Sequence, residues 1–324
     1  MTAVPPRGLV AADMGGSFLK FAVVVSEEPE HATADRTFGR VPMSDTEERS
    51  VADVLADAVG QALRTADRLG IPVSGIGVCS PGPFDWHRAV SLMKHKFLSI
   101  QGQELWPLVR ARLPRVAAIA MRLVPDSYAF AAGERDHGAA RDYSRCLYIT
   151  LGTGIGSALS ENGRIFLHLP DKSPDGSIWC APYRDGITED YVSKKAILSG
   201  YAGARASAAP RDRAPAAPPG DRAPGLDVAD IAARARAGEE AALDVFGRFG
   251  RHLGAALRAY ASGFDPQCIV IGGGLAPCFP LFESELKRET REMPGLSAIA
   301  VSTLGEIGPL LGIAATYEEG YREP

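Results

Sequence analysis

The stretch LVAADMGGSFLKFAVVV, residues 9–25, sets two apolar runs on either side of a short polar segment. The apolar, β-branched composition of each run predicts a strand, and residues 13–17 predict a tight reversal between the two strands. A reversal explains one glycine. It does not explain why Asp13 ends the first strand or why two glycines and the hydroxyl of Ser17 follow. A carboxylate, bare backbone and a hydroxyl together favour a turn that binds phosphate.

Two other glycine clusters also follow apolar runs. Residues 145–167, RCLYITLGTGIGSALSENGRIFL, repeat the hairpin pattern, and residues 267–276, QCIVIGGGLA, form an apolar run that ends in glycines. The chain has no G-x-x-x-x-G-K-[ST] sequence, which excludes a P-loop, and GTGIG leads into a strand, which argues against a dinucleotide fold. Each cluster alone is most simply a tight turn. Three together favour two hairpins that bind a polyphosphate between two lobes, with Asp13 near a magnesium ion that keeps much of its water.

Composition narrows the class of protein. The chain has 324 residues, is 46% hydrophobic and carries a net charge of −4. This length predicts two lobes, and the weak negative charge argues against nucleic-acid binding. No apolar run approaches the roughly 20 residues of a membrane-spanning helix, and the first residues lack the pattern of a signal peptide. We therefore expect a cytoplasmic protein that does not bind membranes, with its five cysteines reduced.

The order of elements predicts an α/β protein with two similar halves. Each half begins with a β-hairpin and continues into α/β units. The clearest helix is expected over residues 51–69, ended by Gly70, and two more over 226–262; residues 36–43 and 116–124 are expected as strands. Residues 168–186 read as a long loop, and residues 203–225 as an Ala-, Pro- and Arg-rich surface insertion.

Eight segments of the chain, in this order, resemble the ROK family of sugar kinases, which includes glucokinases. They are DMGGS, GVCSPGPFD, VPDSYAFAAGE, ITLGTGIGSALSENGRIF, GITEDYVSKKAI, ARAGEEAALDVFGRFGRHLGAAL, DPQCIVIGGGLA and LGEIGPLLGIAATY. The resemblance runs from about residue 8 to 318. It implies a two-lobed actin-like ATPase fold, ribonuclease-H-like in each lobe, with a central interlobe cleft. We expect a small lobe at 1–122 plus 308–324 and a large lobe at 123–307, with hinges near 122–126 and 304–309.

The resemblance also implies the reaction. Members transfer the γ-phosphoryl group of ATP, with Mg²⁺, to a sugar hydroxyl, and the catalytic base corresponds to Asp126. An aspartate at this place is also a good N-cap for the helix that follows, and both roles are compatible. The resemblance implies that ATP and Mg²⁺ are bound through Asp13, Gly15, Gly16, Ser17, Gly152, Thr153, Gly154, Gly272, Gly273 and Gly274. Asp13 is the expected magnesium residue, through water.

Four residues match acceptor-binding positions of the family: Gly82, Asp85, Glu189 and His168. Each has a simpler alternative. Asp85 follows Pro-Gly, where aspartate is an ordinary turn residue. Glu189 suits the first turn of a helix, whose dipole favours negative charge. His168 follows an apolar run, where a lone histidine is as often structural.

The chain departs from the family mainly on the acceptor side. Pro125 replaces the asparagine before the catalytic aspartate, and Tyr128 replaces a later one. Because Pro125 has no side-chain donor or acceptor, a sugar hydrogen bond available to relatives is lost. Phe18 stands where lysine is common. Only Cys180 remains of the zinc-binding cysteines, so no structural zinc is expected, and Trp179, Pro182 and Tyr183 are expected to pack that loop. These changes favour an acceptor other than glucose: another hexose, an amino or N-acetylated sugar, or a valiolone-type C7 cyclitol, since cyclitol kinases of natural-product pathways are similar to this family.

Two other functions remain to be weighed. Some ROK proteins are transcriptional regulators, but here the phosphate hairpin begins at Gly8 and the charge does not favour DNA. A catalytically inactive sugar-binding protein is the other alternative, although such a protein would be expected to lose Asp13, Asp126 and the glycine clusters first. The family resemblance further implies a homodimer.

Overall fold

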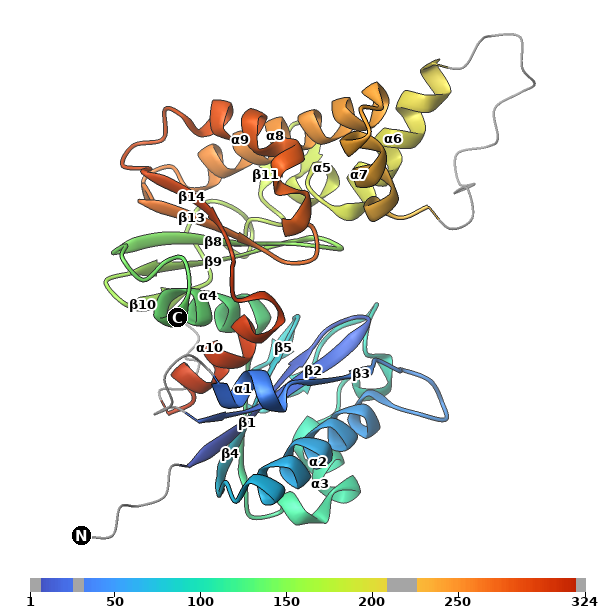
Figure 1. Cartoon of the computed structure of the whole chain (residues 1–324), viewed down its shortest axis with the longest axis vertical. Helices are drawn as coiled ribbons and strands as arrows, with labels where there is room; N and C mark the ends of the chain where they lie inside the picture. The colour runs from blue at the N-terminus through green and yellow to red at the C-terminus, as the bar shows by residue number, and fades with distance from the viewer. Residues whose placement is uncertain (1–6, 26–31, 209–225, 319–324) are drawn as a thin grey trace. The chain divides into compact units, whose positions relative to one another are not determined.

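A computed structural model describes residues 7–25, 32–208 and 226–318 of the chain (Figure 1). The described residues form two compact units. Unit 1 comprises those of 1–141 and 303–324, and unit 2 comprises those of 142–302. Each unit contains a five-stranded sheet with helices packed against it. The predicted α/β class and the division into two lobes are confirmed.

The sheet of unit 1 has the strand order β3-β2-β1-β4-β7. Its strands are β1 (Gly8–Met14), β2 (Phe18–Val25), β3 (Gly39–Pro42), β4 (Val73–Ser80) and β7 (Ala120–Pro125). Strands β1 to β3 are antiparallel, whereas β4 and β7 run parallel to β1. The hairpin predicted over residues 9–25 is confirmed, with Met14 paired to Leu19 next to the turn.

Helices cover both faces of this sheet (Figure 1). They are α1 (Ala32–Thr37), α2 (Val51–Leu69), α3 (Leu105–Arg112), α4 (Asp126–His137) and α10 (Gly308–Thr316). A short hairpin, β5 (Phe84–Asp85) and β6 (Val90–Ser91), lies between β4 and α3. Helix α2 has the predicted bounds, because Ser50 and Asp53 form a capping box and Gly70 adopts a left-handed φ of 66°. Helix α1 was not predicted; it occupies the first residues of the strand expected over 36–43.

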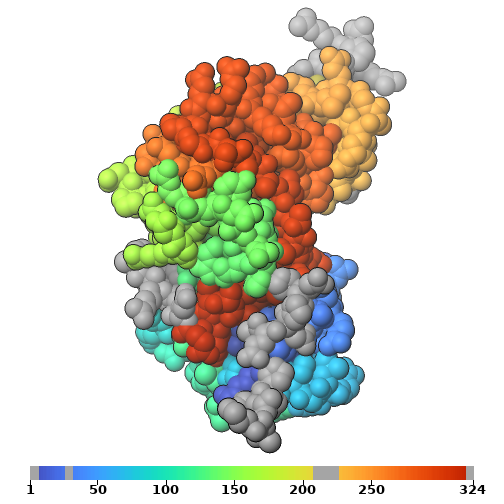
Figure 2. Space-filling model, turned by 60° about the vertical axis from the view of Figure 1, so that its left-hand side comes forward, coloured from blue at the N-terminus to red at the C-terminus, as the bar shows by residue number. Residues whose placement is uncertain are grey.

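Unit 1 extends past the predicted boundary at residue 122 because α4 packs on α10. The two helices approach so closely that a side chain on Gly133 would overlap the carbonyl of Gly308, and one on Gly312 would overlap that of Ala129. Helix α10 also contacts β1, β2 and β4. In Figure 2 the red atoms of α10 lie beside the blue atoms of the first strands. Unit 1 therefore resumes at Thr303, earlier in the chain than the predicted boundary at residue 308.

The sheet of unit 2 repeats that of unit 1, with the order β10-β9-β8-β13-β14. Its strands are β8 (Arg145–Leu151), β9 (Ile155–Glu161), β10 (Arg164–Phe166), β13 (Cys268–Gly272) and β14 (Ala298–Val301). Three antiparallel strands again precede two parallel ones, so the two halves that the sequence predicted to be similar have the same strand order.

The helices of unit 2 gather on one face of its sheet around a single apolar core (Figure 1). They are α5 (Thr188–Tyr191), α6 (Lys194–Ala208), α7 (Val228–Arg236), α8 (Glu240–Tyr260) and α9 (Phe279–Thr290). The helices predicted over 226–262 correspond to α7 and α8. Helix α6 extends into the predicted insertion at 203–225, whose residues 209–225 lie outside the described residues.

The long loop predicted over 168–186 is confirmed as mostly irregular, with one small ladder, β11 (Pro182–Tyr183) and β12 (Gly186–Ile187). The buried Tyr260 hydroxyl of α8 donates to the carbonyl of Gly176, 2.8 Å away, and so attaches the loop to the core. Contrary to the expectation that they pack the loop, Trp179 and Pro182 are exposed.

No cysteine forms a disulfide. Within the described ranges, no helix has both the length and the apolar composition needed to cross a bilayer.

Candidate active site

Strand register brings the side chains of Asp13, Cys79 and Asp126 to one edge of the unit 1 sheet. The parallel strands β1, β4 and β7 end at the same edge, where Asp13 is paired with Cys79 in the β1–β4 ladder. Asp126 directly follows β7, whose last residue, Pro125, pairs with Ser80. Asp13 and Asp126 were predicted to belong to one site, and the fold brings both to this edge.

Asp13 is almost fully buried, with 8% of its surface exposed, and partners hold both of its carboxylate oxygens. Oδ2 lies 3.4 Å from Lys20 Nζ, and Oδ1 lies 3.4 Å from the Cys79 thiol, which donates to it. Lys20 Nζ also lies 3.6 Å from Oε1 of Glu306. The Asp13 carboxylate is thus oriented by a cation and a weak donor, which suits a group that must keep its direction near a metal ion.

The turn between β1 and β2 is an exposed stretch of backbone. Gly16 and Ser17 are exposed, and Gly15 is partly so. A Cβ on Gly15 would lie 2.6 Å from the carbonyl oxygen of Phe18, so this position requires glycine. Exposed backbone with no obstructing side chain lets a phosphate oxygen approach closely.

Asp126 is the first residue of α4, not its N-cap. The cap position is taken by Pro125, which has no side-chain donor or acceptor, so the N-cap alternative for Asp126 is wrong. The Asp126 carboxylate instead accepts a hydrogen bond from the N–H of Ser127, 2.7 Å away. Burial, and after it the negative charge of Asp13, raise the pKa of Asp126 to about 6. A carboxylate with such a pKa is a better proton acceptor near neutral pH than an ordinary aspartate.

The sequence did not single out three residues that the fold brings to this edge: Lys20, Cys79 and Lys96. Lys20 could have been found from the hairpin register, since it lies directly opposite Asp13. Cys79 was interpreted only as a core residue. Burial, and then the charges of Asp13 and Asp126, raise its thiol pKa well above the usual value, so the thiol stays protonated. Lys96 lies in a loop with no motif that would have signalled it.

Unit 2 brings its two glycine clusters together in the same way. Strands β8 and β13 are parallel neighbours, and Thr150, two residues before Gly152, pairs with Gly272, the first glycine of the other cluster. Gly273 has a left-handed φ of 85° and packs so closely on Leu151 that a side chain there would overlap its backbone. Gly152 and Gly274 have open space where a side chain would be. The predicted nucleotide-binding residues of unit 2 therefore share one sheet edge.

Glu189 lies at this same edge. Its Oε2 accepts from the N–H of Ile155, 3.2 Å away, and a side chain on Gly154 would overlap its carboxylate. Lys194 N–H donates to the carbonyl of Gly152 at 3.0 Å. The start of α5 and the start of α6 thus support the β8–β9 turn, and Glu189 has a structural contact beside the acceptor role that the resemblance implies.

The remaining acceptor candidates have local partners. Oδ1 of Asp85 accepts from the N–H of Arg88 at 3.0 Å, as an ordinary turn aspartate does, and Gly82 is exposed nearby. Nδ1 of His168 lies 3.2 Å from the hydroxyl of Ser177.

In the loop where the sequence resemblance implies zinc-binding cysteines in relatives, Cys180 is hydrogen-bonded within its own loop. Its thiol donates to Oδ1 of Asp175 at 2.9 Å, and the N–H of Ser177 donates to the same oxygen at 2.8 Å. Within the part of the chain that the structure describes, no three His, Cys, Asp or Glu side chains form a metal-binding group.

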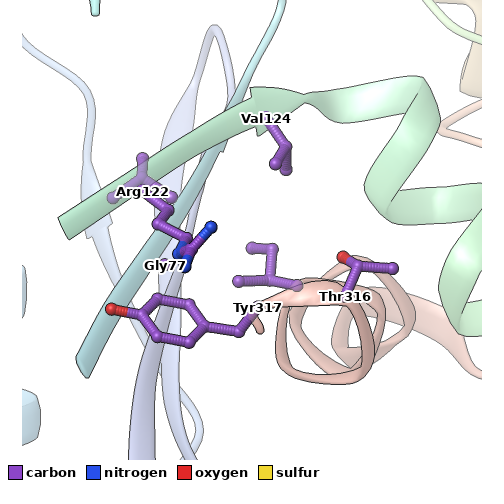
Figure 3. A pocket seen from close by; sticks show the side chains of 7 residues that line it. Gly77, Arg122, Val124, Thr316 and Tyr317 are labelled. Atoms are coloured by element: carbon purple, nitrogen blue, oxygen red, sulfur yellow. The ribbon is translucent and has the colours of Figure 1, made fainter. Parts of the chain in front are cut away.

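A small cavity elsewhere in unit 1 is no substrate site. Its volume is about 10 Å³, roughly enough for one water molecule. Figure 3 shows the Arg122 side chain near the Tyr317 ring, whose centroid lies 5.3 Å from the guanidinium carbon. The Tyr317 hydroxyl donates to the carbonyl of Ala120 at 2.8 Å, so the end of α10 is bound to β7.

The arrangement of glycine turns, Asp13 and Asp126 can be compared with known proteins. The model of the ROK family matches residues 9–319. This chain belongs to the ROK family. Its fold is accordingly the actin-like ATPase fold, which is consistent with the two similar sheets.

Relatives within the ROK family differ in function. A glucokinase of Streptomyces coelicolor is 28% identical over 278 residues, which cover 82% of each chain. A xylose repressor of Bacillus spizizenii is 21% identical over 282 residues, covering 83% of this chain and 67% of the repressor. Among solved structures, a ROK glucokinase from Streptomyces griseus in complex with glucose and AMPPNP has a TM-score of 0.71 at 24% identity, with 97% of this chain and 100% of that chain covered.

Proposed function

We propose that this chain is an ATP- and Mg²⁺-dependent kinase that transfers the γ-phosphoryl group of ATP to a hydroxyl of a hexose or sugar-like polyol. The observation that carries the proposal is the pair of carboxylates at the end of β1 and β7. One, Asp13, is held by Lys20 and Cys79 beside an exposed glycine turn. The other, Asp126, has a pKa raised to about 6. Phosphoryl transfer needs these two things: a phosphate and metal site, and a base for the attacking hydroxyl.

Asp126 is the base in this proposal. The acceptor oxygen bonds to the γ-phosphorus while the bond from phosphorus to the bridging oxygen of ADP breaks, and the hydroxyl proton passes to the Asp126 carboxylate. The bond from Ser127 N–H to Oδ1 fixes the orientation of the carboxylate. Protein groups do little covalent chemistry in such a reaction, so orientation and charge account for most of the catalysis.

Asp13 fits a magnesium site of the kind found in kinases. Mg²⁺ is usually bound by one or two carboxylates, by phosphate oxygens and by water, so a single carboxylate beside a phosphate-binding turn is sufficient. When bound, the ion would neutralise charge on the phosphate oxygens. The two glycine clusters of unit 2 and the β1–β2 turn are the proposed contacts for ATP, which is supported by the AMPPNP complex of the similar glucokinase.

The acceptor is proposed to differ from glucose. Pro125 and the buried Tyr128 stand where the family resemblance implies asparagines, and neither offers an amide to a sugar hydroxyl. The loss of these amides favours an acceptor other than glucose, and a C7 cyclitol of the valiolone type is the proposed alternative to a hexose. Asp85, Glu189 and His168 are the proposed acceptor contacts. A homodimer and a cytoplasmic location stay predictions from the sequence.

A catalytically inactive or regulatory role is the competing function, because the family includes repressors. The raised pKa of Asp126 supports an enzyme, since a sugar-binding protein gains nothing from a partly buried base beside a second carboxylate.

The test is release of ADP, measured by a coupled assay with ATP and Mg²⁺ across glucose, mannose, fructose, N-acetylated hexosamines and C7 cyclitols. Turnover of one acceptor that is lost in Asp126→Asn supports the kinase and identifies its acceptor. A wild-type chain that binds ATP but releases no ADP with any acceptor contradicts the proposed function and favours the inactive alternative.

A further inference from the structure

One cation near the glycine turn, Lys96, takes no part in the steps proposed for Asp13 and Asp126. Lys96 lies in the loop between β6 and the 3-10 turn at Leu98–Ile100. Its Nζ lies 3.2 Å from the point where a Cβ on Gly16 would be. The ammonium group therefore lies over the exposed backbone of the β1–β2 turn, and the absence of a side chain at Gly16 makes room for it.

The loop that carries Lys96 is firmly anchored. The next residue, Phe97, is buried in the core of unit 1 with 2% of its surface exposed. Oδ2 of Asp45 accepts from the N–H of Leu98 at 2.6 Å, and Oδ1 accepts from that of Ser99 at 3.0 Å. Two backbone donors and a buried ring thus fix the chain on one side of Lys96.

The backbone beside Lys96 is also strained. Phe97 has a φ of 57°, in the left-handed region that residues with a bulky side chain rarely adopt. Such a conformation persists only where the surrounding structure requires it. Here it turns the loop so that the Phe97 ring enters the core while Lys96 Nζ remains 5.8 Å above that ring, at the turn.

The charge of Lys96 is not neutralised as that of Lys20 is. Lys20 lies beside two carboxylates, Asp13 and Glu306. Among the described residues, Lys96 Nζ forms no ion pair, and it lies over the Phe97 ring in a cation–π contact. A partly buried cation over exposed turn backbone is a ready partner for an anion.

Lys96 also acts on the proposed base. Its positive charge lowers the pKa of Asp126, against the larger raising effects of burial and of Asp13. The cation is therefore close enough to both the glycine turn and the base to interact with each electrostatically. In the proposed kinase reaction, the glycine turn binds the donor phosphate and Asp126 contacts the acceptor hydroxyl, so the phosphoryl group moves between these two groups.

We propose that Lys96 binds the terminal phosphoryl group of the nucleotide over the β1–β2 turn and stabilises the charge on that group as it passes to the acceptor. The proposal rests on the proposed kinase function. The atoms exchanged are those of that reaction: the bond from the γ-phosphorus to the bridging oxygen breaks and the bond to the acceptor oxygen forms. Lys96 neither gains nor loses a proton, because its role is to supply fixed positive charge.

The test compares Lys96→Ala, Lys96→Met and Lys96→Arg with Lys94→Ala, an exposed lysine of the same loop. Binding of AMPPNP, ADP and AMP, each with Mg²⁺, is measured by calorimetry, with thermal unfolding as a check on folding. We expect Lys96→Ala and Lys96→Met to bind AMPPNP at least about tenfold more weakly, with AMP unchanged. Their kcat should fall by about 100-fold, as for loss of one charge-stabilising donor, while the KM of the acceptor changes less than about threefold. Lys96→Arg should recover part of both effects, and Lys94→Ala should match the wild type.

Other outcomes overturn the proposal. If AMPPNP and AMP lose affinity equally in the Lys96 variants, or if Lys94→Ala loses as much, the role of Lys96 is structural. If the wild type binds AMPPNP but transfers phosphate to no acceptor, the kinase function fails. Whether Lys96 binds the terminal phosphate is then decided by one comparison, the loss of affinity for AMPPNP against that for AMP in the Lys96 variants. If the wild type binds no nucleotide, both proposals fail.

Discussion

Lys20 faces Asp13 directly across the β1–β2 hairpin, with Nζ 3.4 Å from Oδ2. The lysine side chain is 24% exposed and that of the aspartate 12%, so the pair is mostly shielded from water. Removal of the cation would leave the Asp13 carboxylate buried with only the Cys79 thiol as a donor. Loss of one partner of such a pair costs more than loss of a surface salt bridge.

We therefore expect Lys20→Met to lower the free energy of unfolding by about 1–3 kcal/mol, measured by urea denaturation at pH 7.5. The double variant with Asp13→Asn should recover most of this loss, because no buried charge is then unpaired. Lys94→Met, at an exposed position, is the control. Additive losses in the double variant would show that the two side chains do not interact.

Replacement of Asp126 should separate activity from stability. A rise of its pKa from 3.8 to about 6 corresponds to up to about 3 kcal/mol by which the ionised carboxylate destabilises the folded state. Asp126→Asn should abolish turnover, still bind AMPPNP, and unfold at a higher temperature than the wild type at pH 8. The gain should shrink as the pH falls through about 6 towards 4, where the wild-type carboxyl is protonated when folded. Turnover close to that of the wild type would contradict the assignment of Asp126 as the base.

The pH dependence of the reaction follows from the same group. The base must be ionised, so kcat/KM should rise with pH and level off above an apparent pKa of about 6. An aspartate in water would give a midpoint near 4. The measurement is kcat/KM from pH 4.5 to 8.5 at constant ionic strength, with stability checked at each pH. A profile already flat at pH 5 would mean that the base is another group or that its environment differs.

Thiol reactivity should report on the cysteines one by one. Cys180 is partly exposed, whereas Cys79, Cys146, Cys268 and Cys278 are buried. We expect one thiol per folded chain to react with a chromogenic disulfide at pH 8, and Cys180→Ser to remove that phase. The other four should react only in denaturant, and Cys79 is further protected by a pKa raised through burial and the nearby carboxylates. Rapid reaction of a second thiol in the folded chain would contradict this burial.

The contact between Gly154 and Glu189 predicts a coupled pair. A methyl group on Gly154 would overlap the Glu189 carboxylate, so Gly154→Ala should destabilise the chain, and much less so in the background of Glu189→Ala. Gly152→Ala is the matched control, since open space surrounds that position. It should leave the unfolding temperature unchanged while it weakens nucleotide binding. Equal destabilisation by both alanines would argue against the contact.

Local patterns in the sequence were sufficient for much of the fold. The bounds of α2 follow from an apolar period, a capping serine and Gly70, all within one segment of chain. The hairpin over residues 9–25 likewise follows from two adjacent apolar runs and a glycine turn. These features depend on interactions between residues close together in the chain, which composition and spacing encode directly.

The parts that were missed depend on contacts between distant segments. Lys96 is near the site only because a left-handed Phe97 and the Asp45 carboxylate turn its loop toward Gly16, and no spacing rule links these residues. The contact of Glu189 with the β8–β9 turn likewise joins segments 34 residues apart. Asp126 was identified correctly as a residue at a helix start, but its cap position falls on Pro125 because β7 runs directly into α4.

The split of unit 1 into two segments separated by unit 2 has a consequence for the order of folding. Unit 2 is continuous in sequence, so its core can form from residues of one segment of chain. Unit 1 cannot form in this way, because α10, which packs on β1, β4 and α4, is separated from them by the whole of unit 2. The edge that carries Asp13 and Asp126 thus lies in a sheet whose helical cover is complete only after this long-range contact forms, at a loop-closure cost that unit 2 does not carry.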